Sequence, residues 1–100
     1  MRIPLTLLAL SLPLAALAAE DGEKIYKQNC GMCHNAGLAN SPKFGDKDAW
    51  STRLANAKDK AGLLQSVLNG KGAMPPKGGN PKLTDEQVSA ALDHILAAAK

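Results

Sequence analysis

The chain contains the stretch Cys30-Gly31-Met32-Cys33-His34, which places two thiols and an imidazole within one short segment. Cysteines three positions apart on a helical turn lie on the same side of it, so each thiol can add to one haem vinyl group and form a thioether. The histidine that follows then lies close to the iron, where its neutral imidazole can serve as the proximal ligand. The spacing therefore predicts one haem c, attached covalently through Cys30 and Cys33 and ligated by His34.

Three other interpretations of the cysteine pair are a structural disulfide, a thioredoxin-like redox pair and a zinc site. A zinc site would need both histidines, His34 and His94, because the chain has only two cysteines. A thioredoxin-like pair belongs to a βαβ context, and no strand pattern precedes Cys30. Neither the redox pair nor the zinc site accounts for a histidine directly after the second cysteine, so the haem interpretation is favoured.

Residues 1–19 have the pattern of a secretory signal peptide. Arg2 supplies the positive start, Leu5 to Leu17 is largely apolar, and Ala16-Leu17-Ala18 offers a small-residue cleavage site. A membrane span would need roughly 20 uninterrupted apolar residues. We therefore expect residues 1–19 to be cleaved and residues 20–100 to form one exported domain, which is not an integral membrane protein after cleavage. In an oxidising compartment free thiols would be unexpected, and thioether bonds to haem would consume them.

The size and charge of the remaining chain limit the possible functions. About 81 residues suffice for one small domain whose apolar core is marginal, and a buried haem would complete it. Removal of Arg2 leaves eleven basic residues against nine acidic ones, a formal charge of +2. No Lys/Arg cluster with interleaved aromatic residues occurs, so nucleic-acid binding is not expected.

Helical signals recur along the exported part, and no strand alternation or internal repeat appears. The last helix has the strongest signal, because Thr84 and Gln87 form a capping box. The apolar positions after them recur at helical spacing and define one face, which consists of Val88, Leu92, Ile95 and Ala99. We predict an all-α domain of three to five helices wrapped around one haem. The expected helices cover residues 21–30, with Asp21 as the cap, and about 48–57, 59–68 and 85–99.

The sixth iron position separates an electron carrier from an enzyme or gas sensor. Met32 lies between the tethering cysteines and cannot reach across the haem plane, which leaves Met74 and His94. Met74 is the only large apolar side chain in the Gly- and Pro-rich loop of residues 70–81, whereas His94 falls off the apolar face of the last helix. A gap-filling core role is the alternative for an isolated methionine. The loop context favours Met74 as the distal ligand.

Five segments together resemble cytochrome c5, a branch of the class I c-type cytochromes, over nearly all of the exported chain. They are the Cys30–His34 motif, Ser41-Pro42-Lys43-Phe44-Gly45-Asp46, Trp50, Asn69-Gly70-Lys71-Gly72 and Ala73-Met74-Pro75-Pro76-Lys77-Gly78-Gly79. The resemblance implies a small class I cytochrome c domain over residues 20–100, with His/Met ligation. It also implies single-electron shuttling in the bacterial periplasm between membrane-bound or periplasmic donors and terminal oxidases or reductases.

The same resemblance implies roles for three further residues. Pro42 would accept a hydrogen bond from the far nitrogen of His34, and Trp50 and Arg53 would lie near the haem propionates. Some proteins resembling this one carry an additional cysteine pair, which this chain lacks, so no disulfide is expected.

The expected function is electron transfer in the respiratory chain by a monohaem protein that is not an enzyme. The alternative is a haem enzyme or gas-binding domain with a displaceable sixth ligand. Redox partner proteins would dock at the exposed haem edge, where lysines would either steer acidic partners or be ordinary solvated loop residues. These lysines are Lys43, Lys47, Lys71, Lys77 and Lys82.

Overall fold

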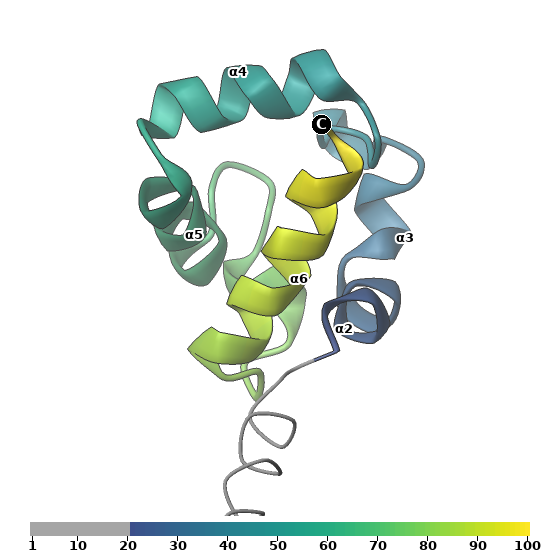
Figure 1. The fold of residues 1–100 in the computed structure, drawn as a ribbon. Helices are drawn as coiled ribbons and strands as arrows, with labels where there is room; N and C mark the ends of the chain where they lie inside the picture. Colours follow the sequence, from purple (N-terminus) through teal and green to yellow (C-terminus); the bar gives the residue numbers. More distant parts are fainter. Residues whose placement is uncertain (1–20) are drawn as a thin grey trace, which may run out of the picture.

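The computed structural model describes residues 21–100, so the predicted signal peptide and its cleavage site lie outside the described residues. The described part is helical and contains no β-strand, only an isolated bridge between Lys71 and Met74. The elements are α2 (Gly22–Asn29), α3 (Gly31–His34), η2 (Leu38–Asn40), α4 (Lys47–Ala57), α5 (Lys60–Asn69), η3 (Pro76–Gly79) and α6 (Asp85–Ala98). In Figure 1, α6 runs between α5 on one side and α2 and α3 on the other, and α4 crosses the top.

Side-chain caps set where the four longer helices begin. Asp21, Asp46 and Asp59 each accept a hydrogen bond from the backbone N–H three positions on, at 3.0, 3.1 and 2.8 Å. Thr84 and Gln87 form the predicted reciprocal capping box at the start of α6. The predicted helix boundaries are therefore confirmed to within one residue, except that the first helix is interrupted at Cys30.

The interruption at Cys30 separates α2 from the single turn that carries the Cys-x-x-Cys-His motif. Cys30 has φ −115° and ψ −30°, and α3 begins at the next residue. The backbone N–H of His34 donates to the carbonyl oxygen of Cys30 at 3.1 Å, which closes the turn. The motif is therefore held on a short helix of its own.

The most extensive helix pair is α2 against α6. At the crossing, a Cβ on Gly22 would lie 2.1 Å from the carbonyl oxygen of Ala90, so only glycine allows the two backbones to approach this closely. This crossing brings the end of α2, and with it the motif on α3, to the flank of α6.

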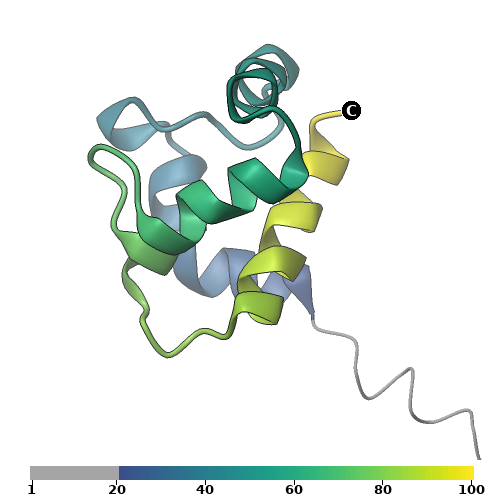
Figure 2. The same ribbon diagram turned by 90° about the vertical axis from the view of Figure 1, so that its left-hand side faces the viewer.

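The core forms where the predicted apolar faces of the helices meet. The predicted apolar face of α6 is buried at Val88, Leu92 and Ile95, whereas Ala99, at the end of the helix, is half-buried. The other buried apolar residues are Ile25, Tyr26, Trp50, Leu63, Leu83 and Ala91. In the turned view of Figure 2, the loop that follows α5 folds back toward α3.

Candidate haem-binding site

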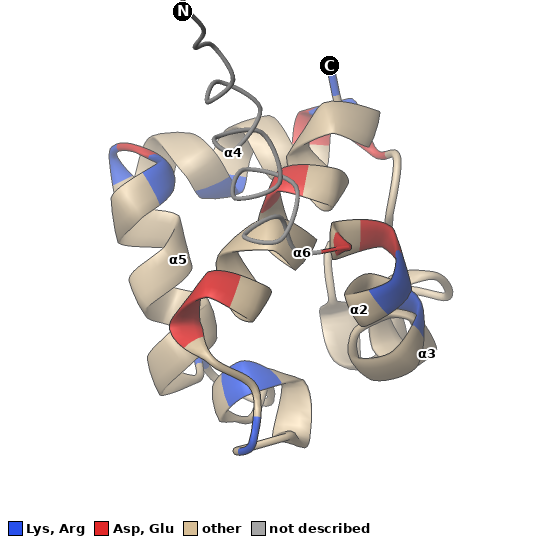
Figure 3. Ribbon diagram, turned by 60° about the horizontal axis from the view of Figure 1, so that its bottom comes forward, with Lys and Arg blue, Asp and Glu red and all other residues tan. Residues whose placement is uncertain are grey.

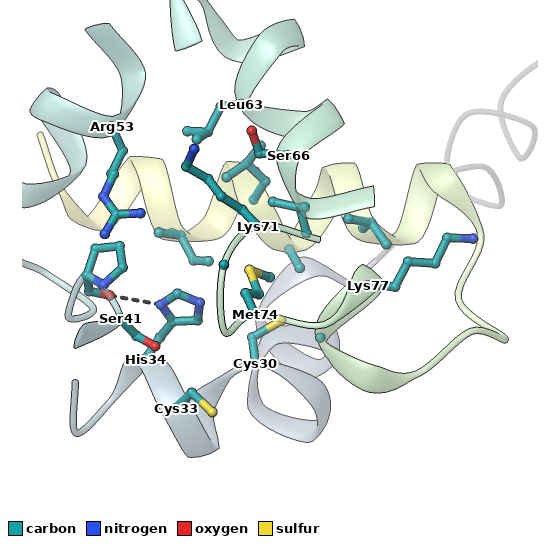
Figure 4. A pocket seen from close by; sticks show the side chains of 18 of the residues that line it. Cys30, Cys33, His34, Ser41, Arg53, Leu63, Ser66, Lys71, Met74 and Lys77 are labelled. Carbon is teal, nitrogen blue, oxygen red and sulfur yellow. Dashed lines mark hydrogen bonds between the residues drawn. The ribbon is translucent and has the colours of Figure 1, made fainter. Parts of the chain in front are cut away.

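A cavity of about 620 Å³ lies between α3, α4, α5, α6 and the loop after α5. Its lining includes all seven residues that the sequence analysis singled out for the site, namely Cys30, Cys33, His34, Pro42, Trp50, Arg53 and Met74. Figure 4 shows the motif side chains on one side of this space and Met74 extending from the loop toward them. Residues forty positions apart in the sequence are thus brought together around one space.

The two cysteines of the motif differ in exposure. Both are free thiols; Cys30 is half-buried and Cys33 is exposed. Burial raises the pKa of the Cys30 thiol, because desolvation disfavours the thiolate. Since both cysteines line the cavity and lie three positions apart, they can be linked to one planar group lying within it.

His34 is buried and its ring is oriented by the backbone of the next loop. Its Nδ1 atom lies 2.8 Å from the carbonyl oxygen of Pro42, and its own carbonyl accepts from the N–H of Phe44 at 2.8 Å. A carbonyl oxygen only accepts hydrogen bonds, so the proton resides on Nδ1 and the lone pair of a neutral ring is on Nε2. This is the tautomer that ligation of a metal through Nε2 requires.

Trp50 and Arg53 lie on α4, and both line the cavity. The Trp50 ring lies 5.4 Å from that of His34, centroid to centroid, and its Nε1–H donates to the carbonyl of Lys43 at 2.8 Å. Sequence reasoning missed this bond, although a buried indole N–H generally needs a partner. Arg53 points into the cavity, and its guanidinium has no ion-pair partner within residues 21–100.

Met74 is held in a closed turn of the loop after α5. The N–H of Met74 donates to the carbonyl of Lys71 at 2.9 Å, and the N–H of Lys71 donates to the carbonyl of Met74 at 3.0 Å. Gly70 has φ +87°, and a Cβ there would lie 2.9 Å from the Met74 carbonyl oxygen. Glycine is therefore required where the chain turns into this loop.

The far walls of the cavity are apolar and come from α5 and α6. The residues of these walls include Leu63, Val67, Val88, Leu92 and Ile95. An apolar slot with two thiols at one border, an imidazole nitrogen and a thioether fits a covalently bound haem, because these are the anchors and ligands that haem iron takes. The residues present thus suit the predicted cofactor.

His94, the other candidate ligand, lies outside the cavity. Its ring packs against Phe44 and Tyr26 at centroid distances of 5.2 and 5.6 Å.

Within residues 21–100, no group of three or more His, Cys, Asp or Glu side chains is arranged to hold a metal ion. No helix in this part of the chain is both long and apolar enough to cross a membrane.

An all-helical domain whose Cys-x-x-Cys-His turn borders an apolar slot of this kind defines the class I c-type cytochromes. Comparison with known proteins agrees. Residues 17–95 match the family model described as cytochrome c oxidase, cbb3-type, subunit III, and the chain belongs to this family of cytochrome c domains.

Individual relatives are small cytochromes. The chain is 40% identical to cytochrome c-555 of Chlorobaculum thiosulfatiphilum over 84 residues, which cover 82% of this chain and 98% of the relative. It is 40% identical to cytochrome c5 of Azotobacter vinelandii over 74 residues, covering 74% and 89% of the two chains. The predicted kinship with cytochrome c5 is confirmed.

Solved structures confirm the predicted fold. A chain in the crystal structure of an electron transfer complex of nitrite reductase with cytochrome c superposes with a TM-score of 0.74 at 44% identity, covering 82% of this chain and 98% of that one. A mono-haem ferrocytochrome c from Shewanella putrefaciens gives 0.65 at 38% identity, covering 77% and 93%. The chain is therefore a small monohaem c-type electron-transfer cytochrome.

Proposed function

We propose that this chain carries single electrons in the periplasm, with one haem c attached through Cys30 and Cys33 and held between His34 and Met74. The observation that carries the proposal is the convergence of these four side chains on one apolar cavity. When bound, haem iron supplies reversible one-electron chemistry, and a histidine with a methionine is a ligand pair that raises its reduction potential. The protein needs no catalytic residue for this task.

The residues around the cavity have distinct tasks in this proposal. His34 is kept in the ligating tautomer by the Pro42 carbonyl, and the apolar walls exclude water. Arg53, whose guanidinium points into the cavity without a partner among the described residues, is free to pair with a haem propionate. Trp50 acts on the loop through Lys43, because its N–H is already bonded there.

Docking of redox partners is proposed at the edge of the site next to α3. Met32 and Leu38 are large apolar side chains exposed there, at 84% and 50%. Lys43, Lys47, Lys71 and Lys82 are also exposed, whereas Lys77 is engaged in a contact with the chain itself. Exposed apolar side chains together with exposed positive charges suit a weak, transient electron-transfer interface.

The proposed partners are redox proteins. The structurally similar cytochrome is in an electron transfer complex with nitrite reductase, which supports a reductase as one partner. We propose that membrane-bound or periplasmic redox proteins are the donors and that terminal oxidases or reductases are the acceptors. Because lysines that steer a partner act through screened charge, the association rate should fall as ionic strength rises. A rate independent of salt would contradict steering by these lysines.

The location and processing of the chain form the last part of the proposal. We propose that residues 1–19 direct export and are removed, so that the haem is attached to residues 20–100 in the periplasm. Expression with and without residues 1–19, followed by cell fractionation and mass measurement, tests this directly. A red, haem-bearing product in the cytoplasm of cells making the shortened chain would contradict it.

Absorption spectra of the exported protein and of Met74→Ala test the ligand set. The wild-type protein should be low-spin in both redox states, bind carbon monoxide poorly and keep its colour in denaturant. Met74→Ala should become high-spin or water-ligated and bind carbon monoxide readily, whereas Met32→Ala, which changes the exposed methionine, should behave as wild type. Rapid carbon monoxide binding by the wild type would favour a gas-binding or enzymatic role.

A further inference from the structure

We propose that Lys77 and Asn80 are positioning residues that keep the Met74 loop closed over the cavity. They lie on the closing arm of the loop, which we define as residues 75–80, and tie it to α6 and to the end of α2. The inference rests on the proposed ligation by Met74.

The first tie joins the closing arm to the start of α6. The Lys77 side chain points away from Met74 (Figure 4), and its Nζ donates to the carbonyl oxygen of Leu83 at 2.8 Å and lies 3.7 Å from the Asp85 carboxylate. Only 24% of this side chain is exposed. In Figure 3 the acidic first turn of α6 lies beside basic residues of the preceding loop.

The backbone of Lys77 has an unfavourable conformation for a residue with a side chain. Its φ is +56°, in the left-handed region that favours glycine. The chain nevertheless has a long side chain there, and the ammonium group makes a charge-assisted hydrogen bond with the Leu83 carbonyl. The contact therefore offsets a local conformational cost within the loop that presents Met74.

The second tie joins the closing arm to the residue that precedes the motif. The Nδ2–H of Asn80 donates to Oδ1 of Asn29 at 2.9 Å, across 51 positions in the sequence. Asn29 Nδ2 also donates to the Ile25 carbonyl at 2.9 Å, and Asn80 Oδ1 accepts from the N–H of Lys82 at 3.1 Å. Each amide is therefore oriented by a second bond, and neither can rotate without losing it.

The backbone of the closing arm also lies close to the end of α2. A Cβ on Gly78, which has φ +65°, would lie 3.0 Å from the carbonyl oxygen of Asn29. The closing arm thus lies against the end of α2, next to Cys30, as well as against α6. Opening the loop would require both side-chain ties to break, so the ties oppose withdrawal of Met74 from the cavity.

The test uses the haem-loaded protein and two variants, each with a matched control of equal charge change. Lys77→Gln is compared with Lys82→Gln. Asn80→Asp, which replaces the donor by an acceptor, is compared with Asn69→Asp. Both control positions are exposed. Loss of the charge-assisted Lys77 bond should raise the rate at which carbon monoxide captures the ferrous protein roughly tenfold, because the closed form loses about that factor in its equilibrium. Loss of the neutral Asn80 bond should raise the rate less, by about fivefold. The controls should stay near the wild-type rate, and Lys77→Arg should largely restore it.

Amide hydrogen exchange gives a second measurement that does not depend on haem ligation. The N–H groups of Met74 and Gly78, which donate to Lys71 and Pro75, should exchange faster in both variants, while those in the middle of α6 should not. Variants that match their controls in capture rate and exchange would overturn the proposal. So would variants that unfold more easily but keep the wild-type capture rate, because the ties would then stabilise the domain without positioning Met74.

The two proposals can fail separately. If the wild-type protein is itself high-spin or captures carbon monoxide rapidly, ligation by Met74 is wrong and the positioning role is overturned with it. If the wild type is low-spin and resists carbon monoxide while both variants do the same, only the role of Lys77 and Asn80 is wrong.

Discussion

The Nδ1 atom of His34 lies 2.8 Å from the carbonyl oxygen of Pro42, and the next carbonyl along the chain, that of Lys43, accepts from the Trp50 indole at the same distance. The His34 and Trp50 rings are thus bound to consecutive carbonyls of one loop. The indole of Trp50 fixes the Lys43 carbonyl, which is next to the Pro42 carbonyl that orients the imidazole of His34. Trp50 therefore acts on His34 through the backbone as well as through ring packing.

Trp50→Phe should loosen the loop that orients His34. The variant retains an aromatic ring but removes the donor to Lys43, which should lower the free energy of unfolding by about 1–3 kcal/mol. Chemical denaturation of the haem-loaded protein measures this. The indole N–H of the wild type, the only one in the chain, should exchange slowly with solvent; exchange at the rate of a free indole would contradict the bond.

Pro42→Ala should leave ligation by His34 intact. The hydrogen bond uses the carbonyl of residue 42, which alanine also provides, so the spectra should remain low-spin. The free energy of unfolding should fall by about 0.4–1 kcal/mol, because the unfolded chain gains conformational freedom. Loss of the low-spin spectrum would show that the proline ring itself is needed to place the carbonyl.

Gly22→Ala should weaken the crossing of α2 and α6. The added Cβ would lie 2.1 Å from the Ala90 carbonyl oxygen, so the helices must separate, at a cost of about 1–3 kcal/mol in the free energy of unfolding. Lys24→Ala, on the exposed face of α2, is the control and should change it by less than about 0.5 kcal/mol. Equal stabilities would mean that the crossing is not as close as the structure has it.

Tyr26 should make the domain less stable in alkali. Burial raises the pKa of its hydroxyl above the ordinary value of 10.0, and a charged Cys30 thiolate adds to this; thioether formation removes the second cause but not the first. Because the folded state keeps the proton that the unfolded state loses, the stabilisation is present below about pH 10 and is lost as the pH rises further.

Tyr26→Phe isolates this effect from lysine titration. Its free energy of unfolding should fall less steeply than that of the wild type between about pH 9 and about pH 11. NMR titration of the single tyrosine gives the pKa directly. A hydroxyl that titrates at or below its ordinary pKa would contradict the prediction.

The helices and the haem motif could be predicted because they depend on neighbouring residues. Asp21, Asp46 and Asp59 cap helices through contacts only three positions away, and Thr84 with Gln87 does the same for α6. Cys30, Cys33 and His34 likewise lie close together on one helical turn, so their spacing alone predicts a haem-attachment motif. Such local patterns predict an all-α, haem-bearing domain before any packing is known.

The partners of several side chains could not be predicted from these patterns. The Trp50 N–H binds the Lys43 carbonyl, and the Lys77 ammonium binds the Leu83 carbonyl. Neither bond was among the predictions from the sequence. A polar side chain usually has several potential partners nearby in sequence and in space. Which one it meets depends on how the helices are arranged.

The sequence by itself thus determined the helical class, the starts of the helices and the chemistry of the motif, because each depends on groups within one or two helical turns. Only the tertiary structure decided that Met74 borders the same cavity as His34, and that Asn80 reaches Asn29. Two packings that join segments far apart in the sequence account for this. The close crossing of α2 and α6 at Gly22 places the motif beside α6, and the contact of η3 with α5 places the Met74 loop.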